Sequence, residues 1–179
     1  MVLGLTGPNA AGKGEIASFL AGRGYRLHSL SDIIREEARR QGLPAEREHL
    51  IRIGNELRAS GGPGVLAEMI LPRLTGQEVV DSIRNPGEVE VLRRLPRFVL
   101  IAVSAPERLR FERSLVRARP GDPQSLEEFQ ARERQENATD PKAQQLRKTF
   151  GMADHVVDNA EGIGALHRQI GELLTALEG

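Results

Sequence analysis

The sequence predicts a three-layer α/β fold, in which helices cover both faces of a parallel sheet of about five strands. Apolar runs typical of strands alternate along the chain with stretches of helical periodicity, an order that produces parallel sheets. The run at 98–103 is apolar without interruption, as strands buried on both faces are. At 179 residues and without an internal repeat, the chain is expected to form one domain, 1–179.

The strands and helices follow from these patterns in chain order. Strands are expected at 1–6, 25–30, 78–83, 98–104 and 155–158. Helical periodicity predicts helices at 15–20, 32–41, 46–60, 65–71, 87–95, 107–117, 126–137, 142–150 and 164–177.

The stretch from Gly7 to Gly14 has the residue order of a phosphate-binding loop and lies between the first strand and the first helix, as that motif requires. Its glycines allow a tight turn that points backbone N–H groups inward, and Lys13 reaches the terminal phosphates of a nucleotide. The expected ATP-binding residues here are Gly7, Asn9, Ala10, Ala11, Gly12, Lys13, Gly14 and Glu15. The sequence therefore predicts the P-loop NTPase version of the three-layer fold.

The loop departs from the usual pattern after its lysine. A Ser or Thr normally stands there and holds Mg²⁺ directly, whereas this chain has Gly14 followed by Glu15. A carboxylate beside bound phosphates is repulsive unless it points away or helps to hold the metal.

Polar residues follow two of the other strands, at the edge where open parallel sheets bind ligands. Asp81, at the end of the third strand, is placed to organise Mg²⁺ through water, and Arg84 offers a planar fork for phosphate. The alternative is an Asp–Arg pair that fixes the turn. After the second strand, Asp32 suits the first turn of a helix, and Arg35 is expected to face the phosphate loop.

Arginines are frequent after the fourth strand. Arg113 and Arg117 lie four residues apart, so one helix presents them as a joint cationic face that can close over phosphates. Three further arginines, Arg108, Arg110 and Arg134, are expected on solvated helix faces among interleaved acids.

Composition excludes several classes of function. The net charge is zero, which argues against nonspecific binding of nucleic acid. There is no cysteine, and hence no disulfide or thiolate site. No apolar run is long enough to span a membrane or to form a signal peptide, so the expected setting is the cytoplasm, with small-molecule partners. The oligomeric state leaves no signal in the sequence.

The chain resembles the nucleoside monophosphate kinase superfamily over nearly its whole length. Residues 31–35 look like the Gly-Asp-x-x-Arg element of adenylate kinases, and residues 81–84 like their Asp-Gly-x-Pro-Arg. Residues 105–113 resemble the helix that leads to the lid. Residues 136–141 are similar to phage-type deoxynucleoside monophosphate kinases and to the kinase-like domain of some deoxycytidylate deaminases, and residues 53–58 to archaeal dephospho-CoA-kinase-like proteins.

The resemblance implies an ATP- and Mg²⁺-dependent kinase of a (deoxy)nucleoside monophosphate. It implies a helical acceptor-binding insert at about 32–75 and a lid at about 113–140. The implied catalytic residues are Lys13, Asp81, Arg84 and Arg117, with Asp81 holding the metal through water. Arg113 and Asn159 join the ATP site, and Asp32, Arg35, Arg58, Arg84 and Arg132 form the acceptor site.

Two alternatives stay open. One is a dephospho-CoA-kinase-like enzyme, in which Asp32 activates a ribose hydroxyl. The other is a nucleotide-binding regulatory module without transfer activity. Gly14 and Glu15 favour it, and it is opposed by Lys13, Asp81, Arg35, Arg84 and Arg113.

Overall fold

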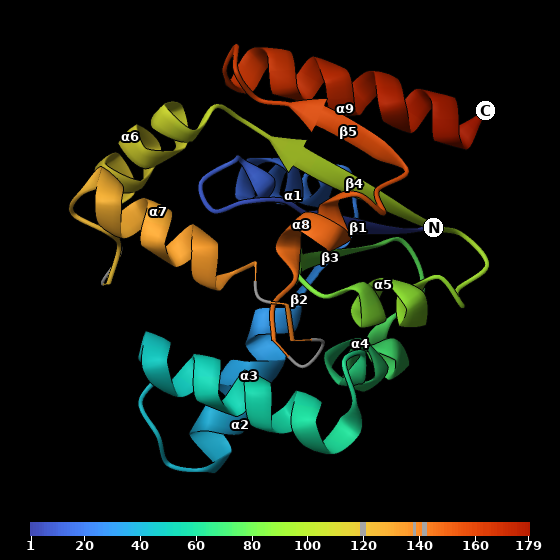
Figure 1. Cartoon of the computed structure of the whole chain (residues 1–179). Coiled ribbons are helices and arrows are strands. Elements are labelled where there is room, and N and C mark those ends of the chain that lie inside the picture. Colours follow the sequence, from blue (N-terminus) through green and yellow to red (C-terminus); the bar gives the residue numbers. More distant parts are fainter. Residues whose placement is uncertain (119–120, 138, 141–142) are drawn as a thin grey trace.

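The computed structural model describes residues 1–118, 121–137, 139–140 and 143–179. Five parallel strands form one sheet in the order β2-β3-β1-β4-β5. Helices flank this sheet on both faces (Figure 1), which confirms the three-layer α/β fold. The strands are β1 (Val2–Thr6), β2 (Arg26–Ser29), β3 (Glu78–Ile83), β4 (Phe98–Ser104) and β5 (His155–Asp158).

One face of the sheet is covered by α1 (Lys13–Ala21) and α9 (Ile163–Glu178). Leu3, Ile101 and Val103 point to this face and pack in one buried cluster with residues of both helices. The clean apolar stripe of α9, which includes Leu166 and Ile170, supplies much of that layer.

The opposite face is covered by α2 (Leu30–Arg40), α4 (Val65–Ile70) and α5 (Pro86–Leu92). Val80 and Leu100 point to this side and pack with apolar residues of the three helices. Leu100 and Ile101 thus serve opposite layers, which is why β4 is apolar without alternation.

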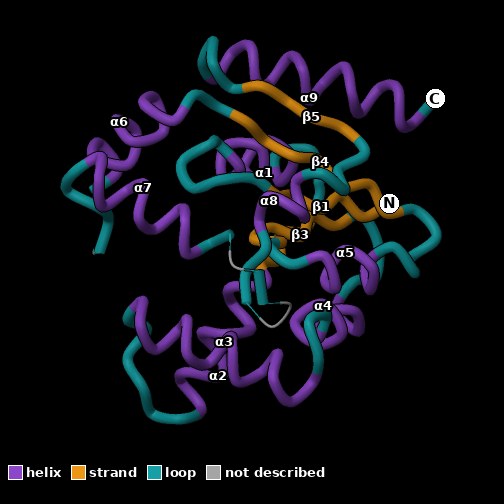
Figure 2. Tube along the Cα trace, in the orientation of Figure 1, coloured by secondary structure: helices purple, strands orange, loops and turns teal. Residues whose placement is uncertain are grey.

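Four further elements lie around the carboxyl ends of the strands or beside α2 and α4. They are α3 (Arg47–Gly61), the 3₁₀ turn η1 (Leu71–Arg73), α6 (Glu107–Arg117) and α7 (Leu126–Gln135). In Figure 2, the α6–α7 arm lies to the left of the sheet and the α2–α3 pair lies below it. No helix in the described part of the chain is long and apolar enough to cross a membrane.

The predicted strands and most predicted helices agree with the structure within a few residues, but the helix expected at 142–150 is shorter. Helix α8 spans only Leu146–Phe150, and Lys142, where the helix was expected to begin, lies outside the described residues. The backbone N–H of Gln145 donates to the Arg84 carbonyl oxygen at 2.9 Å. The Ala143 carbonyl oxygen accepts from Asn85 Nδ2 at 2.7 Å. These long-range bonds replace helical ones, so this segment is anchored to the end of β3 instead.

Candidate active site

The loop between β1 and α1 requires glycine at two positions. Gly7 has φ of 133°, and a Cβ there would lie 2.3 Å from the Val103 carbonyl oxygen. Gly12 has φ of 111°, and its Cβ would lie 2.2 Å from Asn159 Nδ2. Side chains are excluded at both places by the backbone conformation and by the neighbouring atoms. Because α1 begins at Lys13, the positive end of its dipole adjoins the loop.

Lys13 is held inside this loop. Its side chain is 9% exposed, and Nζ donates to the carbonyl oxygens of Gly7 at 2.7 Å and Pro8 at 2.9 Å. Burial, followed by the charge of Arg84, lowers the pKa of Lys13 from 10.5 to about 8, against the opposing effect of Asp81. The ammonium group is therefore poorly compensated, and a bound phosphate would stabilise it.

A cavity of about 670 Å³ adjoins the loop, and we call it the donor cavity. It brings together most of the residues expected to bind ATP or act in transfer. Its lining consists of Asn9, Ala10, Gly12, Lys13, Gly14, Glu15, Asp81, Ser82, Arg84, Glu112, Arg113, Val116, Arg117, Asn159 and Ile163. Gly7 and Ala11, also expected here, belong to the loop backbone behind this surface and do not line the cavity.

The donor cavity offers a metal little direct protein ligation. Asp81 ends β3 at the cavity wall, and its Oδ1 accepts from the Ser82 N–H at 2.6 Å. In the described ranges no group of three His, Cys, Asp or Glu side chains is placed to hold a metal ion. A Cβ added to Gly14 would meet no atom within 4 Å, and Glu15 is exposed beside it. These residues fit Mg²⁺ held by nucleotide phosphates, with Asp81 reaching it through water.

The lining of the donor cavity also includes two exposed apolar side chains and the firmly held Asn159. Asn159 Nδ2 donates to the Ala11 carbonyl oxygen at 2.9 Å, and Arg113 Nη2 donates to the Asn159 carbonyl oxygen at 2.9 Å. Val116 is 89% exposed and Ile163 is 53% exposed, although both line the cavity. Sequence reasoning missed these two residues, and the available signal was an apolar residue on an otherwise charged helix face.

Two arginines of α6 lie at the phosphate loop, and for one of them the sequence prediction was wrong. Arg117 donates to Asn9 Oδ1 at 3.4 Å and pairs with Asp122 at 2.8 Å. Arg110, expected on a solvated face, is 6% exposed. Its guanidinium donates to the carbonyl oxygens of Ala105 and Asn9 and pairs with Glu133 of α7. The packing of α7 against α6 buries it, which helical periodicity within α6 alone does not reveal.

Arg84 joins the donor cavity to the segment before α8. Its Nη1 contacts Glu136 Oε1 at 2.6 Å and donates to Gln144 Oε1 at 3.2 Å. The turn after Arg84 is fixed by a capping box, in which the Asn85 side chain and Glu88 of α5 each accept backbone N–H groups. The capping box therefore fixes the backbone next to Arg84, and with it the position of Arg84 near Lys13.

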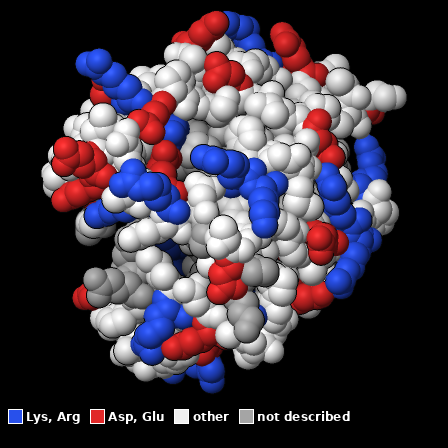
Figure 3. Space-filling model, in the orientation of Figure 1, with Lys and Arg blue, Asp and Glu red and all other residues white. Residues whose placement is uncertain are grey.

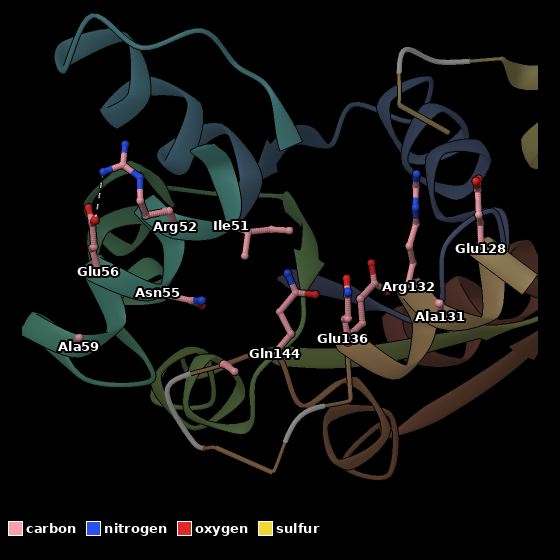
Figure 4. Close-up of a pocket in the computed structure, with 12 residues that line it drawn as sticks. Ile51, Arg52, Asn55, Glu56, Ala59, Glu128, Ala131, Arg132, Glu136 and Gln144 are labelled. Atoms are coloured by element: carbon pink, nitrogen blue, oxygen red, sulfur yellow. Dashed lines mark hydrogen bonds and ion pairs between the residues drawn. The ribbon is translucent and has the colours of Figure 1, made fainter. Parts of the chain in front are cut away.

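A second cavity of about 1110 Å³, the acceptor cleft, lies between α3 and α7. Figure 4 shows Ile51 and Asn55 on α3 facing Gln144 and Glu136, with Arg132 and Glu128 on the α7 side. The surface in Figure 3 alternates positive and negative side chains and is hollowed between α7 and α3. Of the residues expected to bind an acceptor, only Arg132 lines this cleft. Sequence reasoning missed its other lining residues: Ile51, Arg52, Asn55, Glu56, Ala59, Glu128, Ala131, Gln135, Glu136, Ala143 and Gln144.

Three of the expected acceptor residues lie elsewhere. Arg58 is 4% exposed, and its Nη2 donates to Glu88 Oε1, which is fully buried, at 2.9 Å. Such a guanidinium is not accessible to an acceptor, so this position does not fit the sequence prediction. Arg35 and Asp32 pair with each other at 2.8 Å on the exposed side of α2. Neither contributes to the walls of the two cavities.

Comparisons with known proteins agree with this architecture. No family model matches the chain. Among solved structures, TT1252 from Thermus thermophilus superposes with a TM-score of 0.67 at 24% identity, covering 100% of this chain and 98% of that one. A shikimate kinase from Bacteroides thetaiotaomicron superposes with a TM-score of 0.62 at 14% identity, covering 98% of each chain. These similarities establish a P-loop kinase-like fold.

Curated relatives cover the whole chain. A UPF0200 protein from Hyperthermus butylicus is 32% identical, and the match covers 100% of this chain and 96% of the relative. A UPF0200 protein from Halobacterium salinarum is 34% identical, covering 98% of this chain and 93% of the relative. By these matches, the chain belongs to the UPF0200 family.

Proposed function

We propose that the protein is an ATP- and Mg²⁺-dependent phosphotransferase. The observation that carries this proposal is the convergence of Lys13, Asp81 and Arg84 on one cavity beside a loop that requires glycine at two positions. These three residues come from the first helix and from the end of the third strand, so the fold rather than a local motif assembles them. Transfer of a phosphoryl group needs such positioning and charge neutralisation, and little covalent work by the protein.

Each donor-side residue then has a role. Backbone N–H groups of the loop and the Lys13 ammonium hold the β- and γ-phosphates of ATP. Asp81 orders Mg²⁺ through water, and Mg²⁺ supplies charge stabilisation of the phosphates when bound. Arg113 and Arg117 neutralise the phosphates on the α6 side. Val116 and Ile163 give the base an apolar surface beside Asn159.

The proposed acceptor is a (deoxy)nucleoside monophosphate bound in the acceptor cleft. Arg132 lines that cleft, and Arg84 lies where the cleft meets the donor cavity. Asn55, Gln135 and Gln144 supply amides that can pair with the edge of a base. In this proposal the insert at about 32–75 forms one wall and the lid at about 113–140 forms the other. Small-molecule nucleotides are its partners.

Two specific observations support other functions. The carboxylate that lines the acceptor cleft next to Arg84 is Glu136, and a carboxylate there suits a hydroxyl acceptor, as in a dephospho-CoA-kinase-like enzyme. Asp32, the residue first expected in that role, is exposed and paired with Arg35. Gly14 and Glu15 favour a regulatory module that binds nucleotide without transfer.

A panel assay separates these functions. The wild-type protein is given ATP, Mg²⁺ and each nucleoside monophosphate, each deoxynucleotide or dephospho-CoA, and both product and ATP binding are measured. Lys13→Ala is expected to lower transfer at least about a hundredfold, because its charge acts most strongly as charge develops on the phosphates. Lys148→Ala, an exposed lysine of α8, is the matched control. Transfer to no acceptor with ATP binding intact supports the regulatory module instead.

A further inference from the structure

In the part of the chain that the structure describes, the side chain of Arg84 connects the two cavities. It lines the donor cavity, while its two side-chain partners, Glu136 and Gln144, line the acceptor cleft. The side chain of Arg84 is 21% exposed and that of Glu136 is 9% exposed. The pair is thus partly desolvated and lies at the junction between a nucleotide and its acceptor.

The backbone on both sides of this pair is fixed. The N–H of Leu146 donates to the Glu136 carbonyl oxygen at 3.1 Å, and that of Gln145 donates to the Arg84 carbonyl oxygen at 2.9 Å. A change of partner at Arg84 can therefore occur through side-chain rotation, without breaking these two backbone bonds.

Charges of both signs act on Lys13 at the junction in the ligand-free protein. Glu136 raises the pKa of Lys13 and Arg84 lowers it, so both charges act on the phosphate-binding lysine. A phosphate dianion arriving in the acceptor cleft would be attracted by Arg84 and repelled by the Glu136 carboxylate. Because a guanidinium binds carboxylate and phosphate with the same planar fork, the two anions compete for one group.

Building on the proposed function, we propose that Glu136 determines acceptor specificity by holding Arg84 until a phosphomonoester displaces it. An acceptor that carries a phosphate replaces the carboxylate on Arg84 and gives the guanidinium an anion in its place. A neutral hydroxyl compound cannot replace it, since leaving a partly buried guanidinium without its anion is costly. Glu136 thus acts as a positioning residue that favours phosphate-bearing acceptors over alcohols.

The test measures binding of inorganic phosphate, of a nucleoside monophosphate and of its parent nucleoside by calorimetry. A non-hydrolysable ATP analogue saturates the phosphate loop in every titration, so that only the acceptor cleft responds. Glu136→Gln keeps the shape of the side chain and removes its charge. It is expected to tighten binding of both phosphate probes about tenfold, because the competing charge is gone, and to leave nucleoside binding unchanged.

Two further variants keep the result interpretable. Glu128→Gln also removes one negative charge from the acceptor cleft. The Glu128 carboxylate, however, accepts a hydrogen bond from the Gln124 N–H, whereas that of Glu136 pairs with Arg84. Glu128→Gln is expected to change phosphate affinity less than about twofold, as an exposed charge does. Glu136→Asp keeps the charge on a shorter side chain and should give an intermediate affinity. Melting curves identify any variant that does not fold.

Unchanged phosphate affinity in a folded Glu136→Gln protein would overturn the proposal. So would equal tightening in Glu128→Gln, which would show a general effect of cleft charge. A large fall in the kcat of Glu136→Gln, with loss of the acidic limb of its pH profile, would also overturn the proposal. That result would make Glu136 a catalytic base that accepts a proton from a hydroxyl. Failure of the proposed function gives a different result from failure of this proposal, because the wild-type protein would then bind no ATP analogue or transfer no phosphate.

Discussion

The donor cavity and the acceptor cleft are constructed differently. The donor cavity is formed by the phosphate loop, the end of β3 and one face of α6, and two sterically required glycines fix the backbone of its loop. The acceptor cleft lies between helix faces of α3 and α7, and its charged side chains are held mainly by ion pairs. A site defined by backbone geometry leaves a motif in the sequence, whereas a cleft between helices leaves only surface residues.

The largest expected effect tests the donor cavity. Asp81→Asn keeps the shape and the hydrogen bond to the Ser82 N–H but removes the charge that orders Mg²⁺. Mg²⁺-dependent turnover should fall by about two to three orders of magnitude, with an unchanged melting temperature. Both are measured on one preparation. Intact turnover with a lowered melting temperature would mean that Asp81 only fixes its turn.

The next effect separates stability from acceptor binding within α3. Arg58→Ala leaves the fully buried Glu88 without its cation, and burial already raises the pKa of that carboxyl group. The free energy of unfolding should fall by about 3–5 kcal/mol in urea titrations. Arg52→Ala, which breaks an exposed pair with Glu56, should cost less than about 1 kcal/mol. A raised acceptor KM with normal stability in Arg58→Ala would restore the sequence prediction for this residue.

Lys13 provides a test of the donor cavity without ligands. Its pKa is lowered to about 8 by burial, so its charge is a destabilising feature of the folded state below pH 8. Lys13→Met should stabilise the ligand-free protein at pH 7 by about 3 kcal/mol, the equivalent of this shift. Between pH 8 and 10.5 the unfolded chain binds more protons at Lys13, so wild-type stability should rise towards that of the variant. A pH-independent difference would contradict this account.

The smallest expected effect concerns Arg35. The sequence places it at the acceptor phosphate, whereas the structure pairs it with Asp32 and Ser31 on an exposed helix surface. Arg35→Ala is expected to change the acceptor KM less than about threefold, in line with an exposed pair. Arg132→Ala, a change within the acceptor cleft, is the comparison and should raise that KM about tenfold. A larger effect of Arg35 would show that α2 moves towards the cleft in the working enzyme.

Most of the donor side could be predicted because its signals are local. Gly7, Gly12 and Lys13 are close in sequence, and the strand before them fixes their context. Asp81 and Arg84 were expected at the same edge of the sheet because polar residues at the ends of parallel strands meet there, and both line the cavity. Val116 was missed, since its exposure beside the cavity depends on how α6 lies over the loop before α9.

Arginines mark the limit of sequence reasoning in this chain. Three arginines have the same side chain but different surroundings. Arg58 is paired with a carboxylate in the core, Arg84 lies between the two cavities, and Arg110 connects α6 with α7. Spacing along a helix shows which face an arginine takes, but not which carboxylate meets that face. Each partner here is more than twenty residues away along the chain.

By itself, the sequence determined the order of strands and helices along the chain, the parallel sheet of the three-layer fold and the phosphate loop. These depend on periodicity, on apolar runs and on glycine conformations, all of which act over a few residues. Only the tertiary structure decided which charged side chains are buried, which carboxylate holds Arg84 and where the acceptor cleft opens. Those outcomes depend on which helices pack together, because burial and pairing set the free energy of a charge more than its own residue type does.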